Sequence, residues 1–419
     1  MAAAWIMAIH RAAGCGGRQE PRQPRPGRRI QGNARGSDSQ RSPRKGSQGM
    51  TETRCDPAAG FGGGNPLVSV IVPAFNAEAT LAETLAAVTG QTYTGIEVIV
   101  VDDGSSDGTN AIASGFANRD ARVRVISSPN KGVAAARNLG ISSASGSLIA
   151  PIDADDLWHP SYLHKLVAVL TRADEPAECA FSGFRLIDDR SNIIGSSPLH
   201  RMCHIGPYRM LYRNLVGNGS GMVFRKDAWV RAGGYDSGLR DAGYEGCEDH
   251  LLQLMFCAHA PLGSVAEHLV GYRRGPGTMS RNRERMLGSD AMMRDLFLEA
   301  HPAVNPPRWL DRWISAQRDL LLAEARLSRR RFASFGTFML RAMTKDPVAL
   351  AVAIAGKSRS TVRRIFVKYA PPSQHFLSID PADGGAGIGI PGRTGLFSRL
   401  QAARLKRIAS LDEEFHHAA

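Results

Sequence analysis

Apolar positions in residues 68–170 follow two alternating patterns. Continuous β-branched and apolar runs, typical of buried strands, cover residues 68–72, 97–101, 123–126 and 147–152. Apolar residues at helical spacing follow these runs, in 78–88, 132–143 and 160–170. Strands that alternate with helices predict an α/β fold, with a mostly parallel sheet and helices on both of its faces.

The second part of the chain is less regular. Strands are predicted at 179–185, 221–224 and 263–272, and a helix near 248–258. Beyond residue 300 the pattern is helical, and residues 309–343, rich in Leu, Ala and Arg, predict a helical hairpin that stops at Asp346 and Pro347. A helical C-terminal extension of the α/β domain is therefore expected.

Composition restricts the classes of function. With 419 residues, 43% of them hydrophobic, the chain is large enough to bury a full core. The formal net charge of +13 suggests a polyanionic partner, but residues 1–50 hold ten Arg and Lys against two acids, so most of the charge belongs to a tail. Nucleic acid is therefore not favoured as a partner. Six scattered cysteines without metal-ligand spacing favour reduced thiols in the cytoplasm.

Two biased segments flank the predicted domain. Residues 1–64, rich in Arg, Gly, Pro and Ser, predict a disordered basic tail and linker. No apolar run reaches the ~18 residues of a membrane span. Residues 348–368 begin with apolar side chains and continue with Lys and Arg, which fits peripheral contact with the anionic inner face of the cytoplasmic membrane. A solvated basic helix packed on the domain explains the same pattern equally well.

Carboxylates gather at the ends of two predicted strands. Asp153, Asp155 and Asp156 follow one strand, and Asp102 and Asp103 end another. Such crowding is unfavourable unless a cation neutralises it, and oxygen ligands suit Mg²⁺ or Mn²⁺. In a parallel sheet both strand ends face one crevice, where ligands bind. The alternative is a solvated turn in which the carboxylates cap backbone N–H groups.

Five motifs stand in a definite order along the chain. They are VSVIVPAFN at 68–76, VIVVDDGSSD at 98–107, NKGVAAARNLG at 130–140, IDADDLW at 152–158 and the pair Glu248-Asp249. Together they resemble the ordered motifs of family 2 inverting glycosyltransferases. The resemblance implies an A-type glycosyltransferase fold that binds a nucleotide diphosphate sugar, commonly a UDP sugar, together with a divalent metal.

The resemblance also implies roles on the donor side. The residues expected at the nucleotide sugar are Pro73, Phe75, Glu78, Asp103, Arg137 and Asp153. Among them Asp103 corresponds to the carboxylate that reads the base, and Asp153 with Asp155 to the pair that binds Mg²⁺ or Mn²⁺. Arg137 is expected to hold phosphate or to brace Asp153. A purely structural salt bridge is the alternative for Arg137.

On the acceptor side the resemblance assigns a base. Inverting transfer is one in-line displacement, so a general base must remove the proton of the acceptor hydroxyl. Asp249 matches that base, although a carboxylate at this position could simply favour a helix N-terminus. Tyr235, Asp236 and Glu248 match segments that line the acceptor, and Tyr235 is expected to stack on a sugar face.

The same resemblance divides the chain into parts. They are a tail at 1–64, a catalytic domain at 65–285, a helical extension at 286–370 and a flexible tail at 371–419. Within the catalytic domain, residues 65–175 form the half that binds the nucleotide sugar and residues 176–285 the acceptor half.

The expected function is metal-dependent transfer of a single sugar to a hydroxyl of a glycan or lipid-linked acceptor in cell-envelope polysaccharide synthesis. The Gln-x-x-Arg-Trp motif of processive synthases is not evident, which favours single transfer. One alternative is a non-catalytic relative that binds a nucleotide or scaffolds a partner. The other is a nucleotidyltransferase, which would carry a basic Gly-rich loop after the first strand, whereas residues 73–79 contain neither Gly nor a basic residue.

Overall fold

The computed structural model describes residues 65–172, 177–199, 204–244, 246–275, 283–354, 374–382 and 396–418. The predicted tail at 1–64 and most of the basic segment at 348–368 lie outside these ranges. Only residues 348–354 of that segment are described, and they are helical.

A single nine-stranded sheet forms the centre of the described domain. Its strands are β1 (Val68–Ala74), β2 (Ile96–Asp102), β3 (Val123–Ser127), β4 (Leu148–Pro151), β5 (Leu157–Trp158), β6 (Cys179–Ile187), β7 (Ile193–Ser196), β8 (Met222–Arg225) and β9 (Gly263–Arg273). They follow the order β3-β2-β1-β4-β8-β6-β9-β5, with β7 paired to β6. Strands β1 to β4 pair in parallel, whereas β8 joins β4 and β6 antiparallel.

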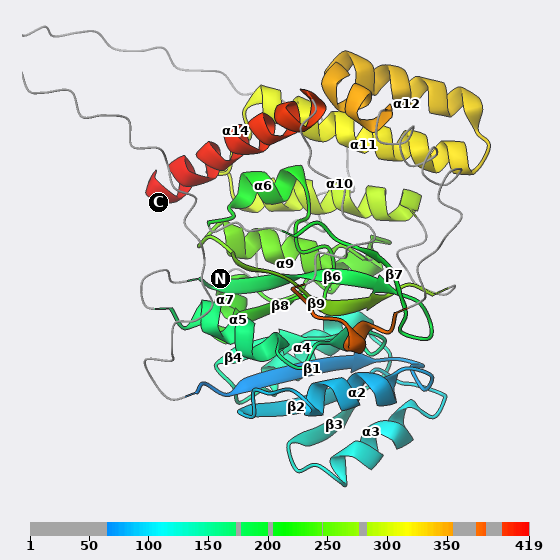
Figure 1. Cartoon of the computed structure of the whole chain (residues 1–419), viewed down its shortest axis with the longest axis vertical. Helices are drawn as coiled ribbons and strands as arrows, with labels where there is room; N and C mark the ends of the chain where they lie inside the picture. The colour runs from blue at the N-terminus through cyan, green and yellow to red at the C-terminus, as the bar shows by residue number, and fades with distance from the viewer. Residues whose placement is uncertain are drawn as a thin grey trace, which may run out of the picture. The chain divides into compact units, whose positions relative to one another are not determined.

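Helices cover both faces of this sheet and continue beyond it (Figure 1). They are α2 (Leu81–Thr89), α3 (Thr109–Ala117), α4 (Val133–Ser142), α5 (Tyr162–Leu170), α6 (Pro207–Tyr212), α7 (Lys226–Arg231), α8 (Gly238–Asp241), α9 (Glu248–Cys257), α10 (Arg283–Ala300), α11 (Arg308–Ser328), α12 (Phe332–Lys345) and α14 (Leu396–Ala418), with a 3-10 turn η2 (Phe376–Ser378). No helix in the described ranges is long and apolar enough to cross a bilayer.

Strand alternation explains the two cores. Successive side chains of a strand point to opposite faces, so Ile71 of β1 joins the core that contains α4 and α9, while Val70 and Val72 join the core that contains α2 and α5. Helix α4 approaches its face closely at Gly140, where an added Cβ would lie 2.6 Å from Ile71 Cγ2. The predicted α/β fold with flanking helices is confirmed.

The sheet is more mixed than the pattern predicted. Strands β5 and β7 pair antiparallel with β9 and β6, although β6 and β9 run parallel. The sequence pattern does not reveal these pairings, because strand direction depends on connections that hydrophobic periodicity does not encode.

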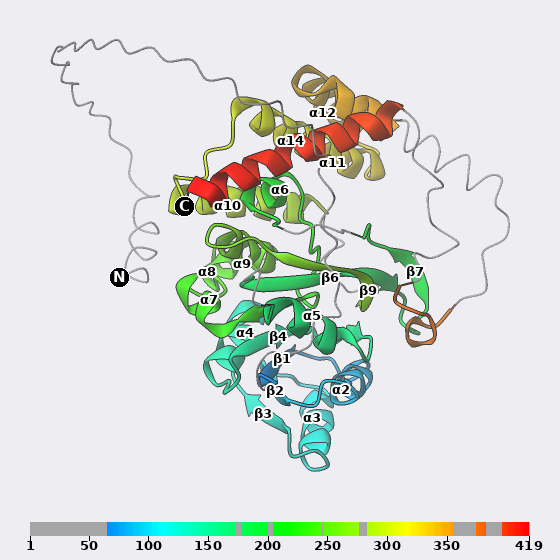
Figure 2. The same cartoon turned by 60° about the vertical axis from the view of Figure 1, so that its left-hand side comes forward.

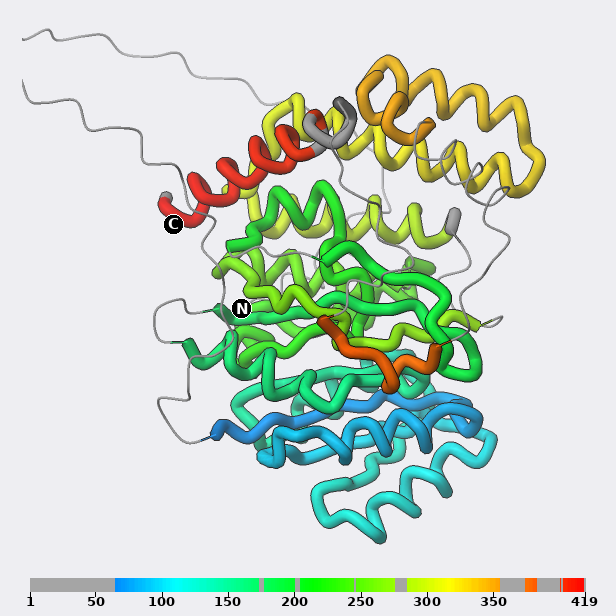
Figure 3. Tube along the Cα trace, in the orientation of Figure 1, coloured from blue at the N-terminus to red at the C-terminus, as the bar shows by residue number. Residues whose placement is uncertain are grey.

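The C-terminal segments pack onto the domain. Helix α10 packs on α9 and α11, α11 packs on α12, and α14 packs on α6 (Figures 1 and 2). The short segment 374–382, orange in Figure 3, pairs with the sheet edge through a bridge between His375 and Asn192 and buries Phe376. The prediction of a flexible tail at 371–419 is therefore wrong for 374–382 and 396–418.

The docking of α14 explains that error. Its Asp412 is fully buried and accepts hydrogen bonds from Arg209 Nε (2.5 Å) and Tyr208 N–H (2.8 Å), both in α6. Farther along α14, Arg404 forms a buried ion pair with Asp346. These partners lie far apart in the sequence, so local composition could not show that the helix is held in place.

We expect Asp412→Ala to lower the free energy of unfolding by about 3–5 kcal/mol, because it leaves the Arg209 guanidinium buried without its partner. Chemical denaturation of the full chain measures the effect. Glu413→Ala, which changes an exposed carboxylate one residue farther along α14, is the matched control and should change it by less than about 0.5 kcal/mol. Equal effects of the two changes would show that α14 does not depend on this ion pair.

Candidate active site

The loops that follow β1, β2 and β4 lie next to one another at one edge of the sheet. The parallel register places Ala74 opposite Asp102 and Ile71 opposite Pro151, so the chain leaves all three strands on the same side. The backbone N–H of Asp103 donates to Ala74 O (2.8 Å), which joins two of these loops directly.

The loop after β1 is tied to the loop after β2. Pro73 lies buried within β1, whereas the Phe75 side chain is 51% exposed at the start of the loop. Asn76 adopts a left-handed φ of 48° and its side-chain oxygen accepts from Ser106 N–H (2.9 Å). Glu78 accepts from Gly108 N–H (2.8 Å), just before α3. Phe75 is thus an exposed aromatic ring on a braced loop, a suitable surface for a planar base.

The two carboxylates after β2 are engaged by backbone. Asp102 accepts from Ser105 N–H (3.0 Å) and Asn110 Nδ2 (2.8 Å), which supports its own loop. Asp103 accepts from Lys131 N–H (2.9 Å) and Gly132 N–H (2.8 Å), immediately before α4. A carboxylate offers about four lone-pair sites, so these bonds leave Asp103 capacity for the predicted contact with a base.

The acidic loop after β4 is held by two residues from distant strands. Ser220 Oγ accepts from Asp153 N–H (3.0 Å) and donates to Asp156 Oδ2 (2.6 Å). Arg273 donates from its N–H to Asp156 Oδ1 (2.8 Å) and from Nε to Asp155 O (2.7 Å). Burial raises the pKa of Asp156 well above its usual range, and the charges of Asp155 and Asp153 raise it further. Asp156 is thus a buried structural carboxyl of this loop.

Arg137 joins the acidic loop to the start of α9. Its guanidinium donates to Asp153 Oδ1 (2.6 Å) and to Glu248 Oε1 (3.0 Å), and it lies over the Tyr235 ring at 5.2 Å. Gly219 permits this approach, since an added Cβ would lie 2.6 Å from Arg137 Nη2. Burial alone would lower the pKa of Arg137, but the neighbouring negative charges raise it, so the side chain stays charged. Of the two contacts predicted for Arg137, with phosphate or with Asp153, the structure contains the one with Asp153.

Asp249 follows Glu248 in the first turn of α9. Its own Oδ1 accepts from His250 N–H (2.8 Å), and the side chain is partly exposed. Burial and the charge of Glu248, opposed by Arg137, together raise the pKa of Asp249 to about 6. A carboxyl that titrates near neutrality can act as a general base at physiological pH.

The sequence of this region also matches a known protein family. Residues 69–232 match the family model described as "Glycosyl transferase family 2". This part of the chain belongs to glycosyltransferase family 2. The match contains β1 to β8, including the acidic loop and Arg137, and the α/β sheet agrees with the A-type fold that the resemblance implied.

Curated relatives are similar to a part of this chain. A glycosyltransferase of Haemophilus influenzae is 36% identical over 132 residues, which are 31% of this chain and 41% of that protein. Glycosyltransferase EpsJ of Bacillus subtilis is 46% identical over 101 residues, 24% of this chain and 29% of that protein. The glucosyltransferase WfgD of Escherichia coli is 31% identical over 153 residues, 36% of this chain and 56% of that protein. The chain thus spans between 29% and 56% of the lengths of these relatives.

Solved structures resemble the family 2 chain only distantly. The mannosyltransferase PcManGT from Pyrobaculum calidifontis, in complex with GDP-Man and Mn²⁺, is 17% identical over 73% of this chain and 82% of that chain, with a TM-score of 0.49. S. aureus TarS 1–349, in complex with UDP-GlcNAc, is 15% identical over 67% of this chain and 92% of that chain, with a TM-score of 0.47. These values are too low to assign a substrate.

Asp153 and Asp155 of the family 2 chain fit a divalent cation that a substrate would help to coordinate. Burial and the charge of the neighbouring Asp153 together raise the pKa of Asp155 to about 6, so a bound cation would relieve the repulsion between the two carboxylates. Across the described ranges no group of three His, Cys, Asp or Glu is placed to hold a metal ion. Mg²⁺ is typically bound by one or two carboxylates plus substrate phosphates and water, which this pair provides for.

The three residues predicted to line the acceptor differ in their burial and in their contacts. Tyr235 is only 2% exposed and packs on Arg137, so in this structure its ring does not face solvent as stacking on a sugar would require. Its hydroxyl has no hydrogen-bond partner among the residues that the structure describes. Asp236 accepts from Gly238 N–H (2.8 Å) at the start of α8. Glu248 is buried and bound by Arg137, which makes it a positioning group in this structure.

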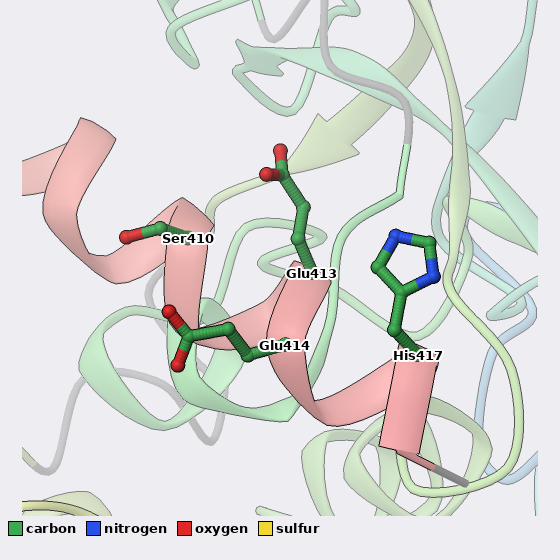
Figure 4. A pocket seen from close by; sticks show the side chains of 4 residues that line it. All are labelled: Ser410, Glu413, Glu414 and His417. Carbon is green, nitrogen blue, oxygen red and sulfur yellow. The ribbon is translucent and has the colours of Figure 1, made fainter. Parts of the chain in front are cut away.

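A separate hollow lies along α14 (Figure 4). It has a volume of about 460 Å³ and is lined by Ser410, Glu413, Glu414 and His417. None of the residues assigned to the candidate active site lines it, so the hollow does not belong to that site.

Sequence reasoning placed Ser220 in a segment similar to the acceptor side and Arg273 in a segment similar to a loop that closes over the diphosphate, but it did not predict that both hold the acidic loop. Ser220 also accepts at its backbone oxygen from Trp158 Nε1 (2.8 Å) and Tyr162 OH (3.2 Å), so one residue holds both ends of the acidic loop. Arg273 also donates to Glu83 (2.8 Å). A lone Ser between glycines and an Arg at a strand end carry no local signal, and only the pairing of β4 with β8 and of β5 with β9 brings them to the loop.

We expect Ser220→Ala to destabilise the fold by about 1–3 kcal/mol, since Asp156 loses one of its two donors and Asp153 N–H loses its acceptor inside a buried site. Urea unfolding measures the change. Ser143→Ala, at the exposed end of α4, is the control and should be close to neutral. If Ser220→Ala behaved like this control, Ser220 would not support the acidic loop.

Proposed function

We propose that this chain transfers a single sugar, with inversion, from a nucleotide diphosphate sugar of the UDP type to a hydroxyl of a glycan or lipid-linked acceptor. The observation that carries the proposal is the double contact of Arg137, which places Asp153 of the acidic loop and Glu248-Asp249 of α9 around one guanidinium. The candidate metal-binding pair and the candidate base thereby share one region of the molecule.

The donor is proposed to lie across the loops after β1, β2 and β4. Phe75 supplies an exposed ring for the base, and Asp103 supplies a carboxylate at the same sheet edge. Asp153 and Asp155 would hold Mg²⁺ or Mn²⁺, whose charge neutralises the departing diphosphate when it is bound. Arg137 orients Asp153 through an ion pair, with its Nη2 2.6 Å from Asp153 Oδ1.

Asp249 is proposed as the general base. In a single in-line displacement, the acceptor oxygen attacks the anomeric carbon while the bond to the diphosphate breaks on the opposite side. The proton of the acceptor hydroxyl passes to the Asp249 carboxylate, and both electrons of the broken bond leave with the diphosphate. The raised pKa of Asp249 suits this step, since a base whose pKa lies near the working pH transfers protons most effectively.

The printed activity of a relative supports the substrate class. WfgD is named a UDP-Glc:alpha-D-GlcNAc-diphosphoundecaprenol beta-1,3-glucosyltransferase, so its donor is a UDP sugar and its acceptor is lipid-linked. Its similarity covers 36% of this chain, and we extend its donor and acceptor classes to this protein as part of the proposal.

Nucleotide sugars with Mn²⁺ should raise the melting temperature of the purified protein. A ligand at about a hundred times its Kd adds about 2.7 kcal/mol of stability by mass action. A panel of UDP-, GDP- and dTDP-sugars, scanned by calorimetry with Mn²⁺ and with EDTA, identifies the donor. Asp155→Asn should lose the Mn²⁺-dependent part of the shift, whereas Asp189→Asn, an exposed acid, should keep it. No shift with any nucleotide sugar would overturn the proposal.

Replacing Asp249 should slow the chemical step without preventing donor binding. We expect Asp249→Asn to lower kcat by about 100- to 10,000-fold while donor binding persists, because a general base contributes that much. In the unaltered protein kcat/KM should rise with pH through about 6, since Asp249 must lose its proton to act, and the variant should lack this limb. Asp241→Asn, an exposed acid in α8, is the control. Full activity of Asp249→Asn would exclude this residue as the base.

A further inference from the structure

Helices α11 and α12 form a hairpin, and ion pairs join the sides of the two helices that face each other. They run side by side (Figures 1 and 2). The buried Asp319 of α11 accepts from Lys345 Nζ (2.7 Å) and lies 3.8 Å from Arg341 Nε, both in α12. These contacts determine which face of α12 turns inward and leave the opposite face outside.

The outer face of α12 is apolar and exposed. Phe332, Leu340 and Met343 are 65%, 57% and 46% exposed. Together with Gly336 they lie within about 80° of arc at 100° per residue, so they form one stripe along the helix. A Cβ added at Gly336 would meet nothing within 4 Å, which shows that the middle of the stripe is open. A surface of this kind usually marks an interaction site.

Three consecutive arginines stand at the end of this stripe. Arg329, Arg330 and Arg331 join α11 to α12, directly before Phe332, and all three are exposed. Residues 308–345 hold nine Arg and Lys against three Asp and Glu. The hairpin therefore combines a surplus of positive charge at its turn with an exposed apolar stripe beside that turn.

We propose that this hairpin surface, formed by Arg329, Arg330, Arg331, Phe332, Leu340 and Met343, docks the protein on the surface of an anionic lipid bilayer. Arginines attract acidic headgroups, and an adjacent apolar helix face inserts at the boundary between headgroups and acyl chains. A nucleic acid would satisfy the arginines but not the apolar stripe.

Other occupants fit the charges less well. The following segment, 355–370, carries five Lys and Arg and no acid, so it repels the arginine triplet and would add to the attraction of an anionic surface. A second copy that docked hairpin to hairpin would bring two positive turns together. An anionic bilayer alone complements both the charge and the apolar stripe.

Vesicle binding by the full chain tests the proposal. Vesicles of phosphatidylcholine alone are compared with vesicles in which about a quarter of the lipid is phosphatidylglycerol, and bound protein is measured by sedimentation. We expect binding to the phosphatidylglycerol vesicles only, weakening as salt is raised because the attraction is screened. The assay contains no donor or acceptor, so its outcome does not depend on the proposed transferase activity.

Substitutions that lower vesicle binding and substitutions that raise it test which residues form the docking surface. Changing Arg329, Arg330 and Arg331 together to Gln should lower the vesicle partition coefficient about a hundred-fold. Gly336→Leu should raise it several-fold, a gain that no folding defect can imitate. Arg119→Gln, just after α3, and Val230→Ser on α7, both at exposed positions, serve as the charge and apolar controls.

Four results would overturn the proposal. They are no preference for phosphatidylglycerol, unchanged partition of the triple-Gln variant, unchanged or weaker partition of Gly336→Leu, and retention on double-stranded DNA in place of vesicles. A concentration-dependent dimer that Phe332→Ser abolishes, without any vesicle binding, would assign the stripe to a second copy instead. Circular dichroism melting of each variant shows that it is folded before binding is compared.

Discussion

The buried guanidinium of Arg137 is the interaction on which the candidate site depends. It interacts with three carboxylates, those of Asp153, Glu248 and Asp249, and such a group is stable only if positive charge compensates it. Arg137 compensates two of them directly and is itself positioned by the packing of α4 on the sheet at Gly140. The close packing of one small residue thus determines how carboxylates from two separate motifs are oriented.

The sequence predicted much of the first half of the fold, because each strand there is a continuous apolar run and each connection is a helix of regular spacing. Asp153, Arg137 and Glu248 were all singled out from motifs, and the structure brings them together. Tyr235 shows the limit of that reasoning. Residue type suggested a ring open to a sugar, but burial depends on packing against α4 that no local pattern contains.

The unpredicted features share one physical cause, which is contact between residues distant in the chain. Ser220 reaches Asp153 across 67 positions and Arg273 reaches Asp156 across 117. The docked position of α14 likewise depends on Arg209, at a separation of 203 residues. Periodicity and composition describe windows of about 10–20 residues, so partners at these separations cannot be identified from these patterns and are identified only in the folded chain.

The long separation between Arg209 and Asp412 has a consequence for biosynthesis. At about 5–20 residues per second, α6 waits roughly 10–40 s after its own synthesis before its buried ionic partner exists. During that interval the face of α6 that α14 later covers is exposed to solvent, and so are the apolar side chains around it. The buried ionic contact of α6 with α14 therefore forms only after nearly the whole chain has been synthesised.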